Sequence, residues 1–160
     1  MWEFINFFIV VIFLVFMIKT NNLNELRREI KKLKDANEEV VVLAGDDAFN
    51  RKVVENGDVD VIVGLEFDRR DFLKQRNSGL NEIMARLAKK NGIKIGVDVG
   101  EIKKLSCVEK ARVLARLRQN IGLCKRLKVE MIVYPRGYGK EVMSLFLVLG
   151  SDSGLARNVV

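Results

Sequence analysis

Short apolar runs alternate with charged, amphipathic stretches along most of this chain. Residues 40–44, 59–65, 93–99 and 129–134 are apolar runs of the length expected for strands buried in a sheet. The segments between them carry apolar residues at helical spacing. Strands separated by helices in this way form a parallel sheet with right-handed crossovers. The pattern therefore predicts an α/β fold, and a chain of 160 residues is most simply one domain, residues 1–160.

The helical segments are bounded by recognisable signals. Asn22 is a plausible N-cap with Glu25 three residues on, and Leu26, Ile30 and Leu33 follow as an apolar stripe. Two further helices are expected over residues 50–55 and 141–149, the latter after a strand that Pro135 ends.

Two other helices have clearer apolar faces. Ser78 is expected to cap a helix that Asn91 and Gly92 stop, and Ser106 with Glu109 predicts a capping box. Their predicted buried faces are Leu80, Ile83, Met84, Leu87 and Ala88 for the first helix, and Leu114, Leu117, Ile121 and Cys124 for the second.

The amino-terminal run over residues 7–18 is unbroken and apolar, so it resembles a membrane anchor. It is shorter than the about 20 residues that a spanning helix needs, and it has neither a leading basic cluster nor a cleavage site. Its Phe, Ile and Val residues favour a buried strand or strand pair. A membrane-tethered basic adaptor is the alternative.

Composition narrows the chemistry. The chain has 28 Lys and Arg against 21 Asp and Glu, a net charge of +7, which favours polyanionic partners such as nucleic acid or an anionic membrane face. It has no histidine, which removes the usual general base and the commonest metal ligand. Cys107 and Cys124 fall in one predicted helix, too far apart to bridge, and are expected to be reduced core residues.

Residues 45–99 carry the most informative pattern. They read GDDAFNRKVVENGDVDVIVGLE, a short insert, and then RNSGLNEIMARLAKKNGIKIGVDV. This order resembles archaeal ribonuclease P protein component 3, the counterpart of the thirty-kilodalton subunit of the eukaryotic enzyme. The resemblance implies a TIM-barrel-like parallel sheet with outer helices. A complete barrel typically takes about 250 residues, so we expect an incomplete or N-terminally short barrel of five or six strands.

The same resemblance implies a function. The chain would be a cytoplasmic, membrane-free subunit of ribonuclease P, which removes 5′ leaders from precursor tRNA with Mg²⁺ held on the ribonuclease P RNA and no cofactor on the protein. The partners implied are that RNA, precursor tRNA, protein component 2 in direct contact, and components 1 and 4.

Basic residues are the candidates for RNA contact, because cations aimed at phosphates supply most of the affinity for RNA. Arg51 is expected to open a helix directly after a strand and its loop. Arg51, Arg76 and Arg86 fall at basic positions of the family's pattern, although the family usually has Lys-Asp where this chain has Arg76 and Asn77. A solvated helix face is the other interpretation of each. The predicted RNA-binding residues are Asn50, Arg51, Arg76, Arg86, Lys89 and Lys90.

The helix after Ser106 is a second basic surface, with one acid, Glu109, between residues 107 and 128. It could bind RNA, face an acidic partner or be a solvated outer helix. Its cations are Lys110, Arg112, Arg116, Arg118, Lys125, Arg126 and Lys128. Aromatic residues outside the amino-terminal run are few, so we expect recognition of folded RNA by shape and backbone. The candidates for stacking are Phe49, Phe67, Phe72, Tyr134 and Tyr138.

Carboxylates at the predicted strand ends suggest an alternative from another class. Asp46, Asp47, Glu66 and Asp98 lie where barrel enzymes keep their catalysts, and oxygen ligands can hold Mg²⁺. A magnesium-dependent barrel hydrolase is therefore the second candidate. Against it, related metal-dependent barrel hydrolases use histidines, and acidic loop residues are also ordinary helix caps.

Overall fold

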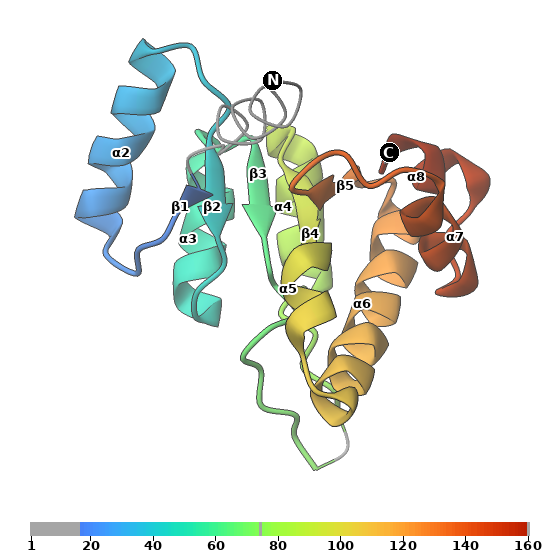
Figure 1. Ribbon diagram of the computed structural model, residues 1–160. Helices are drawn as coiled ribbons and strands as arrows, with labels where there is room; N and C mark the ends of the chain where they lie inside the picture. The colour runs from blue at the N-terminus through green and yellow to red at the C-terminus, as the bar shows by residue number, and fades with distance from the viewer. Residues whose placement is uncertain (1–16, 74, 160) are drawn as a thin grey trace, which may run out of the picture.

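Five short parallel strands form one sheet in the order in which they follow along the chain (Figure 1). The computed structural model describes residues 17–73 and 75–159. The strands are β1 (Met17–Ile18), β2 (Val41–Leu43), β3 (Val61–Val63), β4 (Lys94–Asp98) and β5 (Met131–Tyr134), each paired in parallel with the next.

This sequential order gives the sheet two different faces. Right-handed crossovers between neighbouring parallel strands place successive helices on the same side. Ile62, Ile95 and Val97 point to that side and join the main core beneath the helices, whereas Val61 and Tyr134 belong to a smaller apolar cluster on the other side. One face covered by helices and one apolar face is the arrangement of a barrel wall. The predicted barrel-like parallel sheet is confirmed, and its five described strands form an open sheet with β1 and β5 at the ends.

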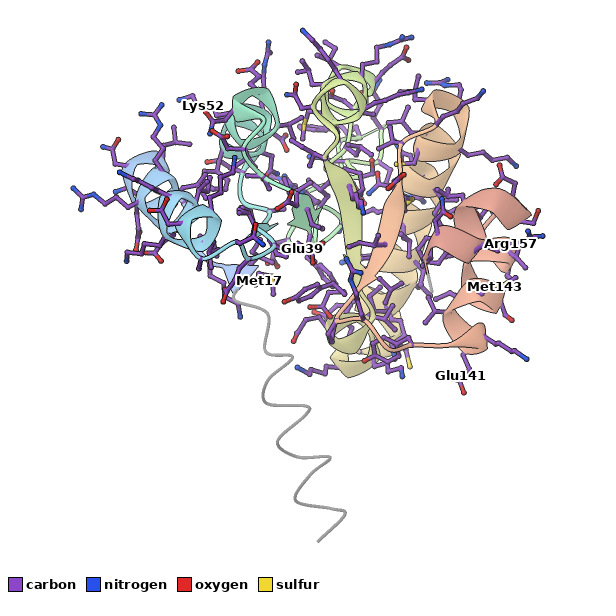
Figure 2. All side chains as sticks on the ribbon, turned by 90° about the horizontal axis from the view of Figure 1, so that it is seen from above. Met17, Glu39, Lys52, Glu141, Met143 and Arg157 are labelled. Atoms are coloured by element: carbon purple, nitrogen blue, oxygen red, sulfur yellow. The ribbon has the colours of Figure 1, made fainter. Side chains whose placement is uncertain are left out.

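The described residues include all five predicted helices and two short ones that the sequence pattern did not indicate, α5 and α8. The helices are α2 (Leu23–Asp35), α3 (Asp47–Asn56), α4 (Glu82–Asn91), α5 (Val99–Lys104), α6 (Cys107–Leu127), α7 (Lys140–Val148) and α8 (Ser153–Asn158). Viewed from above, α2 and the α7–α8 pair lie at opposite ends of the sheet (Figure 2).

Several helix ends are as the sequence predicts. The Asn22 side chain accepts a hydrogen bond from the Asn24 N–H and caps α2. Ser106 and Glu109 form both halves of a capping box at the start of α6. Gly92 ends α4 in the left-handed region, with φ of 70°. These signals are local in the chain, which is why the sequence alone is enough to find them.

Two predicted helix starts were wrong. The cap of α4 is Asn81, whose side chain accepts from the Met84 N–H at 2.9 Å, so Ser78 and Leu80 lie in the preceding loop. Ile83 is 60% exposed, and Ala85 takes its place on the buried face. Helix α3 begins at Asp47, so Arg51 lies within the helix and does not open it.

The predictions for the two cysteines are confirmed only in part. Both cysteines are free and Cys124 is buried, but Cys107 is exposed as the first residue of α6 and is not a core residue. In α6, Val113 is buried where Leu114 was expected.

The apolar run over residues 7–18 lies outside the described residues except for β1. Among the helices that are described, none is long and apolar enough to cross a membrane.

Candidate nucleic-acid interface

The longest connection between the described elements joins β3 to α4 and extends past the carboxyl ends of the strands, beside α6 (Figure 1). We call it the β3–α4 loop, residues 64–81. The side chain of Arg69 holds it from within and is only 7% exposed. Its Nε donates to the carbonyl of Leu65 at 2.8 Å, and its Nη2 donates to the carbonyl of Gly45 at 2.9 Å. Nη1 pairs with Asp47 at 2.6 Å, so the loop is fastened to the start of α3.

A second buried arginine, Arg116 of α6, holds the loop from the other side. Its Nη2 donates to the carbonyl of Arg69 at 2.7 Å and its Nη1 to the carbonyl of Glu66 at 3.4 Å. Its Nε donates to Asp71 at 3.3 Å. The side chain is 7% exposed, so Arg116 is not part of a basic surface as predicted but an internal support of the loop.

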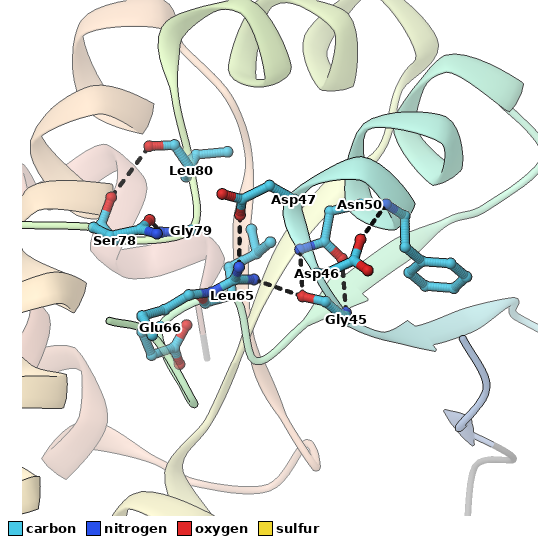
Figure 3. Close-up of polar contacts among 12 residues, drawn as sticks. Gly45, Asp46, Asp47, Asn50, Leu65, Glu66, Ser78, Gly79 and Leu80 are labelled. Atoms are coloured by element: carbon cyan, nitrogen blue, oxygen red, sulfur yellow. Dashed lines mark hydrogen bonds and ion pairs between the residues drawn. The ribbon is translucent and has the colours of Figure 1, made fainter. Parts of the chain in front are cut away.

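Asn50 is also internal. Its Oδ1 accepts from the Gly45 N–H at 2.8 Å and its Nδ2 donates to the Gly45 carbonyl at 3.0 Å (Figure 3). The residue is fully buried, and the neighbouring Asp46 caps α3 by accepting from the Phe49 N–H at 2.7 Å. Both polar ends of the Asn50 amide therefore shape the β2–α3 loop. The prediction that Asn50 contacts RNA does not fit this placement.

The other predicted RNA-binding residues are at the surface. Arg51 pairs with Glu55 on α3 at 2.8 Å, and Arg86 pairs with Glu82 on α4 at 2.7 Å. Both pairs are spaced i, i+4, and the two arginine side chains are 60% and 66% exposed. The helices α3 and α4 pack against each other. Arg76 is exposed in the β3–α4 loop, and Lys89 and Lys90 are exposed on α4.

Helices α4 and α6 join their cations into one surface. Arg126 of α6 reaches Glu82 of α4 at 2.9 Å, and Lys89 donates to the carbonyl of Leu127 at 2.9 Å. The hydrogen bond from Arg86, followed by the charge of Arg126, lowers the pKa of Glu82, which therefore stays ionised between them. We call Arg86, Lys89, Lys90 and Arg126 the basic face. Arg112, Arg118, Lys125 and Lys128 are further exposed cations of α6, while Lys110 is partly buried.

The four strand-end carboxylates have different local roles. Asp46 caps α3, Asp98 caps α5 by accepting from the Glu101 N–H at 2.8 Å, and Asp47 is paired with Arg69. Glu66 is fully buried, and neither carboxylate oxygen receives a hydrogen bond from another residue. Within the described part of the chain, no three Asp, Glu or Cys side chains are grouped to hold a metal ion. The predicted magnesium site therefore finds no support in this arrangement.

Burial raises the pKa of Glu66 from 4.5 to about 7. The charge of Asp98 adds to this effect, while the residue's own main-chain N–H and the charge of Arg69 oppose it. A carboxyl group with such a pKa is substantially protonated near neutral pH.

The aromatic candidates separate clearly. Phe49 and Tyr134 are 4% and 7% exposed and serve the core. Phe67 is partly buried, and the ring of Tyr138 lies 4.6 Å from the ammonium of Lys103. Phe72 is 68% exposed near the tip of the β3–α4 loop. Of the five predicted candidates, Phe72 is thus the one whose ring is open to a ligand.

Several archaeal proteins are similar to this chain in sequence. Over 116 residues, 72% of this chain, the sequence is 30% identical to ribonuclease P protein component 3 of Methanococcus maripaludis strain C6. It is 29% identical over 116 residues to the protein of that name from Methanocaldococcus jannaschii, and 29% identical over 112 residues to that from Methanosarcina acetivorans. This chain is similar to archaeal ribonuclease P protein component 3. The predicted resemblance is confirmed.

The matched region is less than half of each relative's own length. The chain covers 47% of the Methanococcus maripaludis and Methanocaldococcus jannaschii proteins and 44% of the Methanosarcina acetivorans protein. It thus spans about half the length of these curated relatives. No family model matches the chain.

A solved structure agrees on the fold. A chain of the cryo-EM structure of archaeal ribonuclease P with mature tRNA superposes with a TM-score of 0.72 at 24% identity. The match covers 89% of this chain and 62% of that chain. The barrel-like architecture is therefore shared with a chain of that assembly.

Proposed function

We propose that this chain is an RNA-binding protein subunit of ribonuclease P, which supports endonucleolytic removal of 5′ leaders from precursor tRNA. The observation that carries the proposal is the sequence similarity to ribonuclease P protein component 3, which extends over 72% of the chain. On this proposal the RNA performs hydrolysis with Mg²⁺ bound to it. The protein acts in the cytoplasm beside components 1, 2 and 4, with component 2 in direct contact.

The basic face and Arg51 suit such a role physically. RNA binding needs cations whose present partners are easily exchanged for phosphates. Ion pairs as exposed as Arg51–Glu55 and Arg86–Glu82 contribute little to stability, so little opposes that exchange. An arginine can also bind two phosphate oxygens at once. Neutralising phosphates would stabilise the compact active fold of the RNA and lower its demand for Mg²⁺.

The first experiment asks whether tagged protein brings down the ribonuclease P RNA. The second measures precursor-tRNA cleavage by the reconstituted enzyme across a magnesium titration. The double variant Arg51→Ala with Arg86→Ala should weaken RNA binding and raise the magnesium concentration needed for half-maximal cleavage. Arg28→Ala with Lys31→Ala is the matched control, because it removes two exposed cations from α2 that do not line the groove between α2 and α3.

Two results would count against the proposal. Unchanged cleavage at low magnesium by the Arg51 and Arg86 double variant would remove these residues from the RNA contact. Robust cleavage by the purified protein without RNA, abolished in Asp98→Asn, would instead favour a magnesium-dependent hydrolase.

A further inference from the structure

A groove of about 620 Å³ lies between the β3–α4 loop and helices α4 and α6. It adjoins the groove at the strand ends that Asp46 and Asp98 line, and Asp47, Phe72 and Asn77 line both grooves. Its lining brings together one exposed aromatic ring, two arginines and four side-chain amides, which are Phe72, Arg76, Arg126, Gln75, Asn77, Asn81 and Gln119.

Phe72 is held by main-chain hydrogen bonds within the β3–α4 loop. Its N–H donates to the carbonyl of Gln75 at 2.8 Å, and the Gln75 N–H donates back at 3.1 Å, which closes a tight turn. Beneath the turn, Arg116 holds Asp71, and Asp71 also accepts from the Asn77 N–H at 3.0 Å. These hydrogen bonds hold Phe72 and Asp71 in place, so binding at Phe72 loses less conformational entropy than it would on a loop without them.

The charge of the groove favours an anion. Its two acidic residues, Asp47 and Glu82, are already paired with Arg69 and with Arg86 and Arg126. Arg76 adds an exposed cation in the loop itself.

The amides add polar groups at the same place. The Oδ1 atoms of Asn77 and Asn81 accept from the N–H groups of Gly79 and Met84 at 2.9 Å each, so their NH₂ groups are the donors these side chains can offer. Donors beside an aromatic face match the acceptor-rich edges and flat faces of nucleic-acid bases.

We propose that this groove binds unpaired nucleotides of RNA, with a base stacked on Phe72 and the adjoining phosphates near Arg76 and Arg126. The proposal rests on the RNA-binding function above and adds to it a selection for unpaired over paired RNA. Bases inside a duplex are stacked on each other and cannot lie on the ring, whereas the basic face can bind the backbone of either form.

The experiment compares a single-stranded oligoribonucleotide carrying a fluorescent adenine analogue with the same strand in a duplex. Phe72→Ala should weaken binding of the single strand roughly 5- to 100-fold, the range expected for the loss of one base–aromatic stack. Duplex binding should change less than about twofold, since its contacts are to phosphates. Quenching of the analogue on binding should be lost in Phe72→Ala and kept in Phe72→Tyr.

Leu73→Ala is the matched control, since Leu73 is fully exposed beside Phe72 and has no aromatic face. It should leave single-strand affinity within about twofold, a smaller change than the loss of a stack. Both positions are on the surface, so far-UV circular dichroism should be unchanged in either variant.

Other outcomes overturn the inference in distinguishable ways. If the parent binds RNA but Phe72→Ala binds the single strand equally well, the groove is not the site, and the subunit function stands. If Phe72→Ala and Leu73→Ala both lose a protein component of the reconstituted enzyme and keep RNA affinity, the turn is a protein-docking surface. If the parent binds neither RNA form nor the ribonuclease P RNA, the proposed function itself fails.

Discussion

The guanidinium of Arg116 donates a hydrogen bond to the main-chain carbonyl of Arg69 at 2.7 Å. The buried side chain of Arg116 therefore fixes the main chain of Arg69, whose own side chain is also buried. Arg69 in turn reaches back to Gly45 and Asp47 beyond β2. Through these two side chains, α6 and the start of α3 are both fastened to the β3–α4 loop. Loop geometry and therefore the position of Phe72 depend on this pair.

Replacing Arg116 by Met should destabilise the protein by about 2 kcal/mol or more, because the carbonyls of Glu66 and Arg69 lose a buried donor. The β3–α4 loop should also become the first site of limited proteolysis. Urea unfolding and mapped proteolytic fragments measure the two effects. Arg118→Ala is the control, an exposed arginine of the same helix that should change the free energy of unfolding by less than about 0.5 kcal/mol. If Arg116→Met and Arg118→Ala lowered the free energy of unfolding equally, the buried hydrogen bonds of Arg116 would contribute nothing to stability.

Gly79 is needed where the loop passes over Arg69. A Cβ there would lie 1.9 Å from the Leu65 carbonyl oxygen and 2.9 Å from Arg69 Nε, and φ is +74°. Gly79→Ala should therefore lower the free energy of unfolding by more than about 2 kcal/mol, since both strain and a main-chain clash oppose it.

Gly92→Ala separates backbone strain from the main-chain clash as causes of the lower stability expected for Gly79→Ala. Gly92 has φ of +70° but nothing within 4 Å of its Cβ position, so only the conformational strain of about 1 kcal/mol applies. Urea unfolding of both variants compares them. If Gly79→Ala were no worse than Gly92→Ala, the loop would have room to move away from Arg69.

The sequence predicted what depends on near neighbours in the chain. Asn22, the Ser106–Glu109 box and Gly92 act within a few residues, and β-strand runs such as Val61–Val63 are apolar on both faces. The same local logic misplaced the start of α4, because Ser78 and Asn81 are both acceptable caps and only the packed loop selects Asn81.

The loop supports were missed because their partners are distant in the chain. Arg116 and Arg69 are 47 residues apart, and Arg116 looked like one cation among seven on a basic helix. One signal was present: Arg116 and Asn120 are spaced by four residues and adjoin the buried Leu117 and Ile121, so polar groups face the core there. Polar residues at core spacing indicate internal hydrogen bonds and not a surface.

Asn50 and Arg51 are neighbours with opposite roles, and their substitutions should separate stability from RNA binding. Asn50→Ala leaves the buried N–H and carbonyl of Gly45 without partners, so the free energy of unfolding should fall by about 2 kcal/mol. Arg51→Ala removes only an exposed ion pair and should cost less than about 0.5 kcal/mol.

At a temperature where both variants are folded, Arg51→Ala should lower RNA affinity more than Asn50→Ala does, although it destabilises the protein less. Arg51→Ala should bind RNA more weakly and show a shallower dependence on salt concentration, because one phosphate contact is lost. Asn50→Ala should keep the parent slope. Filter binding across a salt series, alongside urea unfolding, makes the comparison; a parent-like slope in Arg51→Ala would take this residue out of the phosphate contacts.

Glu66 should make the stability of the protein depend on pH. Its pKa is about 7 when folded and 4.5 otherwise, because burial penalises the ionised form. Between these values the folded protein holds a proton that the unfolded chain has released. Raising the pH across this interval therefore favours unfolding, by up to about 1.4 kcal/mol per pH unit for one group. The contribution is fully present below pH 4.5 and lost by the time pH has passed about 7.

Glu66→Gln tests this, because Gln has nearly the same shape and never ionises. The free energy of unfolding of the variant minus that of the parent should increase from pH 4.5 to about 7 and stay constant above that range. Urea unfolding at a series of pH values gives this difference directly. Glu38→Gln removes one negative charge from the surface and is the matched control for net charge. A difference between Glu66→Gln and parent that does not vary with pH would mean that Glu66 is not buried as an isolated carboxyl group.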